Sequence, residues 1–68
     1  MEISIVIPVY NEQQALPKLY NSLKKVLDSL QKKYEIILVD DGSTDRTWEV
    51  LSALRVKDDS LKIIRFTR

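Results

Sequence analysis

The stretch that decides the fold is residues 34–45, YEIILVDDGSTD, where an apolar run ends at two adjacent carboxylates. Apolar, β-branched runs of this kind are typical of a strand buried on both faces of a parallel sheet. The polar turn after it is rich in residues that cap helices, and we expect Ser43 or Thr44 to be the N-cap, with Asp45 in the first helical turn. The stretch therefore predicts a strand, a tight turn and the start of a helix.

Upstream, the sequence shows the same pattern of a strand followed by a helix. Residues 3–9, ISIVIPV, are almost wholly apolar, and this strand should end near Pro8 because proline cannot donate to a sheet ladder. Apolar residues then recur at three- and four-residue steps, which predicts an amphipathic helix from residue 14 or 15 to about residue 31. Pro17 fits its first turn, where a missing N–H is no loss.

Downstream, the pattern ends with a second helix and a third strand. The helix fades near Arg55, and the strand covers residues 61–66, LKIIRF. The apolar positions of this helix are Trp48, Val50, Leu51 and Leu54. Strands that alternate with helices are expected to be parallel and joined by right-handed crossovers. We therefore predict an α/β protein, a β-α-β-α-β, Rossmann-like half of a doubly wound parallel sheet in spatial order 3-2-1, in one domain over residues 1–68.

Composition excludes several classes of function. Eleven basic and ten acidic residues give a net charge of +1, which makes no case for binding nucleic acid or an anionic membrane surface. Cysteine and histidine are both absent, which excludes disulfides and thiolate metal sites. The apolar runs are far shorter than the ~20 residues that span a bilayer, and no signal peptide is expected at the N-terminus.

The predicted half sheet would be incomplete by itself. In doubly wound sheets the ligand crevice lies at the carboxyl ends of the strands, where the strand order reverses, and this needs a fourth strand beside the first. Without it, the apolar strand at residues 3–9 would be an open edge, which natural sheets seldom leave bare. We therefore expect this chain to be a truncated part of a larger domain.

Two polar loops mark the expected ligand site, at residues 8–12 and 40–43, because each follows the carboxyl end of a strand. Gly42 is the only glycine, so neither a G-x-G-x-x-G turn nor a Walker loop can form. The adjacent Asp40 and Asp41 would repel phosphate and suit the donor edge of a base or the hydroxyls of a ribose. A diphosphate at this site would need a divalent cation to offset the charge.

Purely structural roles are the alternative for the same residues. Tyr10 could simply cover the sheet edge, and residues 11–12 could lead into the first helix. A capped turn without any ligand would account equally well for Asp41, Ser43 and Asp45.

Three further features are predicted to be structural only. Trp48 lies on the apolar face of its helix and belongs to the core. The lysines of the first helix form a solvated face. Asp58 and Asp59 form a solvated loop at the amino end of the sheet, away from the crevice.

Residues 4–12, SIVIPVYNE, and 35–45, EIILVDDGSTD, resemble the two opening signatures of family 2 glycosyltransferases with the GT-A fold. One long helix separates them, as in that family. The chain most resembles the polyprenyl-phosphate sugar transferases, the group that includes dolichol-phosphate mannose synthase. Residues 63–68, IIRFTR, resemble the third strand of this group.

The resemblance implies a nucleotide pocket built from both loops. In the first loop, Pro8, Tyr10 and Glu12 would line the pocket and Asn11 would shape the loop.

In the second loop, the resemblance implies that Asp40 accepts a hydrogen bond from an imide-type N–H of uracil or guanine. Asp41 would lie alongside, reaching the ribose or ordering the pocket. Gly42 and Ser43 would form the tight turn into the second helix.

The resemblance also implies the activity of a longer parent protein. This parent would be a hexosyltransferase that moves a sugar from a UDP- or GDP-sugar to a polyprenyl phosphate, in the cytoplasm or at the cytoplasmic face of a membrane. Its Mg²⁺ or Mn²⁺ would be bound by an Asp-x-Asp motif beyond residue 68, so we expect no catalytic or metal-binding residue in this chain and no turnover from it alone. The sugar, the base, the stereochemistry and the oligomeric state are left open.

Two other functions remain as alternatives. One is a stand-alone nucleotide-binding or regulatory module that performs no chemistry. The other is a receiver-like or flavodoxin-like signalling module, which needs a phosphorylatable aspartate at the end of the third strand, where residues 66–68 read Phe-Thr-Arg.

Overall fold

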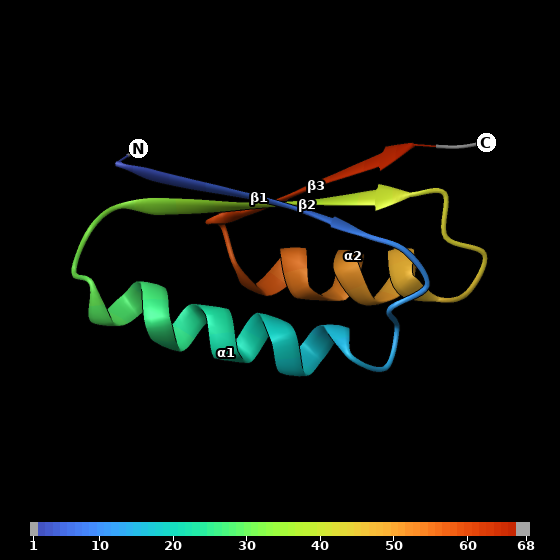
Figure 1. The fold of residues 1–68 in the computed structure, drawn as a ribbon, viewed down its shortest axis with the longest axis horizontal. Helices are drawn as coiled ribbons and strands as arrows, with labels where there is room; N and C mark the ends of the chain where they lie inside the picture. The colour runs from blue at the N-terminus through green and yellow to red at the C-terminus, as the bar shows by residue number, and fades with distance from the viewer. Residues whose placement is uncertain (1, 67–68) are drawn as a thin grey trace.

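The computed structural model describes residues 2–66 as a parallel three-stranded sheet with both helices on one of its sides (Figure 1). The strand order is β1-β2-β3, which confirms the predicted α/β class and the predicted order. The elements are β1 (Ile3–Val9), α1 (Leu16–Ser29), β2 (Tyr34–Asp41), α2 (Thr47–Lys57) and β3 (Leu61–Phe66).

The strand register brings the carboxyl ends of the strands to one edge of the sheet. Val9 pairs with Asp40, and Asp41 pairs with Phe66. The loops that leave β1 and β2 therefore start side by side, as Figure 1 shows.

The core lies between the sheet and the two helices. The fully or almost fully buried apolar side chains are Val9, Leu16, Leu27, Ile36, Leu38, Leu51 and Leu61. They come from every strand and helix, so each element contributes apolar surface to one common core.

The prediction of strands buried on both faces is wrong for the residues described. In β1 the exposed and covered side chains alternate, and Val6 is 61% exposed. Ile64 and Phe66 of β3 are exposed in the same way. The reason is that both helices pack on the same side, so only every second residue of a strand is covered.

The helix boundaries differ from the predictions by a few residues. α1 begins at Leu16, with Pro17 in its first turn as expected, and ends two residues before the predicted limit, at Ser29. α2 begins at Thr47, so a start immediately after an N-cap at Ser43 or Thr44 is wrong.

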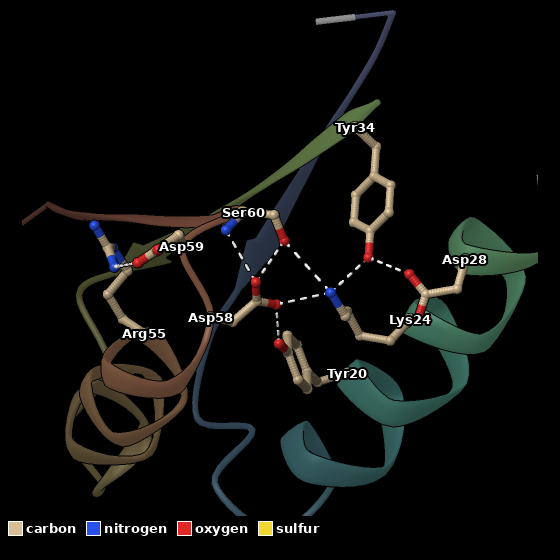
Figure 2. A network of polar contacts seen from close by, with 8 residues as sticks. All are labelled: Tyr20, Lys24, Asp28, Tyr34, Arg55, Asp58, Asp59 and Ser60. Atoms are coloured by element: carbon tan, nitrogen blue, oxygen red, sulfur yellow. Dashed lines mark hydrogen bonds and ion pairs between the residues drawn. The ribbon is translucent and has the colours of Figure 1, made fainter. Parts of the chain in front are cut away.

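A polar network joins α1 to the amino end of the sheet (Figure 2). Lys24 Nζ lies 3.0 Å from Asp58 Oδ2 and donates hydrogen bonds to Tyr34 Oη and Ser60 Oγ. Tyr20 Oη donates to the same Asp58 carboxylate. These contacts link one helix, the first residue of β2 and the loop before β3.

Two predictions are corrected by this network. Lys24 does not belong to a solvated face, because its side chain is only 26% exposed and it is paired. Asp58 is not a solvated loop residue either, since its side chain is 13% exposed. The neighbouring Asp59 does point into solvent, where it lies 3.8 Å from Arg55.

Candidate functional site

The two loops at the carboxyl edge are joined by hydrogen bonds between backbone and side chains. The Asn11 N–H donates to Ser43 Oγ at 2.9 Å, and the Glu12 N–H donates to Thr47 Oγ1 at 2.9 Å. The Arg46 N–H donates to the side-chain carbonyl of Gln13 at 3.0 Å. The β1–α1 loop is thus fixed against the β2–α2 loop.

Asn11 is central to this contact. Its backbone is left-handed, with φ of 50°, a conformation that asparagine adopts more readily than most residues. Its side-chain oxygen Oδ1 accepts hydrogen bonds from the N–H groups of Thr44 at 2.8 Å and Asp45 at 3.3 Å. The Asn11 side chain therefore provides the acceptor for two backbone N–H groups in the turn before α2.

Asp45 organises the start of α2 from just outside the helix, not from its first turn as predicted. Its Oδ1 accepts a 2.9 Å hydrogen bond from the Thr47 N–H and a second bond from the Thr47 hydroxyl. The pKa of the Asp45 carboxyl is lowered, and the hydrogen bond from the Thr47 hydroxyl is the main cause. Partial burial acts in the opposite direction, and hydrogen bonds from backbone N–H groups, including that of Gln13, add to the lowering.

Asp40 lies on the helix side of β2, together with Ile36 and Leu38, and its side chain is fully buried. Oδ1 accepts a 2.9 Å hydrogen bond from the Ser43 N–H. Oδ2 is buried and has no hydrogen-bond partner among residues 2–66. The base contact expected of Asp40 stays a prediction, and with the carboxylate covered as it is here it would require the side chain to turn outward.

Asp41 is directed to the opposite side of the sheet, because successive side chains of a strand alternate. It is partly exposed, and Tyr10 is 50% exposed. Tyr10 directly follows Val9, and Asp41 directly follows Asp40. Because Val9 and Asp40 are paired, the side chains of Tyr10 and Asp41 leave the sheet at neighbouring positions. Pro8, at the end of β1, is exposed on the side away from the helices.

A separate polar recess of about 380 Å³ lies at the beginning of α1. It is lined by Asn11, Glu12, Gln13, Gln14, Ala15 and Asp45. Of the predicted site residues it includes Asn11 and Glu12 but neither Tyr10 nor Asp41. The expected site residues thus border two surfaces on either side of the joined loops.

Some residues that shape the site were not found from the sequence. Gln13 and Thr47 each bridge the two loops, and Thr47 is fully buried although it is polar. No spacing rule marks them, because their partners lie more than thirty residues away along the chain. Trp48 packs against the core as expected. The guanidinium carbon of Arg65 lies over the indole, 5.3 Å from the centroid of the Trp48 ring.

Residues 2–66 contain no group of three or more histidine, cysteine, aspartate or glutamate side chains that could hold a metal ion. Within the same range neither helix has the length and apolar character needed to cross a membrane.

Comparison with known proteins gives consistent matches. Residues 4–68 match the family model described as glycosyl transferase family 2. An uncharacterized glycosyltransferase of Bacillus subtilis (strain 168), YkcC, is 43% identical over 68 residues, which are 100% of this chain and 21% of that protein.

Two similar relatives carry a more specific name, undecaprenyl-phosphate 4-deoxy-4-formamido-L-arabinose transferase. The protein from Edwardsiella ictaluri (strain 93-146) is 55% identical over 49 residues, 72% of this chain and 15% of the relative. The protein from Yersinia pestis (strain Pestoides F) is 51% identical over 59 residues, 87% of this chain and 18% of the relative. The chain thus spans about a fifth or less of the length of these relatives.

Proposed function

The chain belongs to glycosyl transferase family 2, and on that premise we propose that it binds the nucleoside part of a UDP- or GDP-sugar donor. The observation that carries the proposal is the pairing of two polar loops at the carboxyl edge of a parallel sheet, where α/β proteins bind their ligands. Glycosyltransfer needs an activated sugar donor, and these loops offer carboxylate, amide and aromatic groups that could recognise the nucleoside of a nucleotide-sugar.

We assign the base contact to Asp41 and a supporting role to Asp40. Asp41 is partly exposed on the side away from the helices, next to the half-exposed Tyr10. A carboxylate there can accept from the imide N–H of uracil or guanine, and the tyrosine ring can stack on the base. Asp40 holds the turn through the Ser43 N–H.

The remaining predicted residues complete the pocket in this proposal. Pro8 is exposed on the same side of the sheet as Asp41 and would lie against the base, whereas Glu12 lines the recess at the start of α1 and would meet a part of the donor beyond the base. Asn11 and Ser43 join the loops. In this proposal these groups recognise the nucleoside, and the groups that carry out the transfer lie outside residues 1–68.

For the whole protein we propose transfer of a glycosyl group to a polyprenyl phosphate, at the cytoplasmic face of a membrane or in the cytoplasm. Two of the similar relatives are named undecaprenyl-phosphate 4-deoxy-4-formamido-L-arabinose transferase, and undecaprenyl phosphate is a polyprenyl phosphate. An acceptor phosphate oxygen would form a bond to the anomeric carbon as the bond to the diphosphate breaks, and the nucleoside diphosphate would leave.

Residues 2–66 bring no three metal-ligating side chains together. We therefore derive no step through Mg²⁺ or Mn²⁺ from these residues. In this proposal any such ion takes its ligands from residues beyond Arg68, and residues 1–68 alone have no transferase activity.

Isothermal titration of UDP and GDP, with and without Mn²⁺, tests the proposal on residues 1–68 and on the complete gene product. We expect tight binding to the complete product and weak or undetectable binding to residues 1–68. Equal affinity of both would identify a self-sufficient nucleotide-binding module instead. If neither protein binds either nucleotide, the assignment of the two loops is wrong.

A further inference from the structure

A continuous chain of hydrogen bonds runs between the ends of β1 and β2. Asp40 Oδ1 accepts from the Ser43 N–H at 2.9 Å, and Ser43 Oγ accepts from the Asn11 N–H at 2.9 Å. Asn11 Oδ1 then accepts from the Thr44 and Asp45 N–H groups. We call this set of contacts, made by Asp40, Asn11 and residues 43–45, the loop clasp.

The loop clasp joins Asn11 to Asp40, and each of these residues is next in sequence to a residue that the proposed function assigns to the nucleoside. Asn11 follows Tyr10, and Asp40 precedes Asp41. Any change in the clasp therefore alters the distance and angle between the tyrosine ring and the carboxylate, while the strands and the core remain paired through their own contacts.

We propose that Asn11 is a positioning residue, which fixes the Tyr10 ring relative to the Asp41 carboxylate so that one nucleoside base can meet both. This inference rests on the proposed function. Asn11 itself need not touch the base. It acts through the left-handed turn of its backbone and the carbonyl of its side chain.

The chemistry of the position favours asparagine over other residues. Glycine would tolerate a φ of 50° but would leave the Thr44 and Asp45 N–H groups without this acceptor. Aspartate would keep an acceptor oxygen but would add negative charge beside Asp45. A neutral, short amide meets the geometric and electrostatic requirements together.

The first test measures the clasp without any ligand, in the complete gene product. Amide hydrogen exchange of Thr44 and Asp45 should be faster in Asn11→Gly than in the wild type. Asn11→Asp, which retains an acceptor oxygen, should restore much of the protection. Thr44→Ala is the matched control, because it removes only a 3.5 Å hydroxyl contact and keeps the Thr44 N–H.

The second test measures positioning, with UDP and GDP as probes. Asn11→Gly should weaken nucleotide binding about tenfold, the scale of one or two lost hydrogen bonds, at a temperature where thermal melting shows the variant to be folded. In a Tyr10→Ala background the same substitution should change affinity less than about twofold, because the group that it positions is gone.

These outcomes separate the two proposals. Unchanged exchange at Thr44 and Asp45 would show that the clasp does not form, and a full tenfold effect in the Tyr10→Ala background would show that Asn11 does not act through Tyr10. If the wild-type protein binds neither nucleotide, the proposed function fails and the positioning role fails with it, whereas the exchange experiment still decides whether the clasp exists.

Discussion

Lys24 Nζ lies 3.0 Å from Asp58 Oδ2 at the amino end of the sheet, the end opposite to the joined loops. Both side chains are largely shielded from solvent, so salt screens this pair less than an exposed one. The pair connects α1 to the loop before β3, with Tyr20 and Ser60 as further donors to the same carboxylate (Figure 2). The position of α1, and with it the end of the β1–α1 loop, therefore depends on contacts far from the site.

Asp58→Asn should lower the free energy of unfolding by about 2 kcal/mol. The substitution removes a charge that faces Lys24 and receives hydrogen bonds from Tyr20 and Ser60, and it leaves a shielded ammonium group without its counter-ion. Urea unfolding followed by circular dichroism measures the change.

The neighbouring Asp59→Asn is the matched control. Asp59 is fully exposed and lies 3.8 Å from Arg55, an arrangement that solvent screens and that adds little to stability. Equal effects of the two substitutions would show that the Asp58 network adds nothing beyond general surface charge.

The same network makes stability depend on pH in the acid range. Burial by itself raises the pKa of the Asp58 carboxyl, but hydrogen bonds from Ser60 and Tyr20 and the contact with Lys24 outweigh it and hold the pKa below its usual range. A lowered folded-state pKa means that the stabilisation is present above the unfolded pKa of about 3.9 and is lost as pH falls through the folded value.

We therefore expect the difference in unfolding free energy between the wild type and Asp58→Asn to be constant from about pH 5 to 8 and to shrink below about pH 4. Urea unfolding at a series of pH values gives this difference directly, because the other carboxyl groups titrate in both proteins. A difference that does not change down to about pH 2 would contradict the role given to the ionised carboxylate.

The element order could be predicted because the periodicity of apolar residues is a local property. The run ending at Asp40 and the helical spacing of residues 16–29 indicated which segments are strands and which are helices. Burial of both sheet faces could not be judged this way, since an apolar residue such as Val6 carries no information about whether a second layer is present.

The site was predicted only as far as the strand ends locate it. Polar residues after β1 and β2 had to meet, but the partners of Gln13 and Thr47 depend on the loop conformations, which no periodicity encodes. The network of Lys24 and Asp58 was missed for the same reason: both residues read as ordinary surface charges until the fold brings them together.

Gly42→Ala should destabilise the protein by about 1–2 kcal/mol. Gly42 has a φ of 76°, where a Cβ atom collides with the following carbonyl oxygen. Gly42→Asn should cost less, because asparagine tolerates the left-handed region better than alanine does. Thermal unfolding of both variants gives the comparison; an alanine variant as stable as the wild type would mean that the turn can adopt another conformation.

Arg65→Gln should change the fluorescence of Trp48, the only tryptophan in the sequence. The guanidinium carbon lies 5.3 Å from the ring centroid, and losing this cation–π contact should also cost about 0.5–1 kcal/mol in unfolding free energy. Lys62→Gln is the control on the same strand, since Lys62 pairs with Glu35 and not with the indole. Identical emission spectra for Arg65→Gln and the wild type would show that the stacked arrangement is not populated.

Asp41→Asn should weaken UDP or GDP binding by the complete gene product about ten- to hundredfold, because an amide N–H would face the imide N–H of the base. Asp40→Asn should act differently. Its side chain is buried and accepts the Ser43 N–H, so we expect lower stability with a smaller loss of affinity. Titration calorimetry and urea unfolding of both variants separate these effects. A larger loss of affinity in a folded Asp40→Asn protein would return the base contact to Asp40, and would require its carboxylate to turn outward when the nucleotide binds.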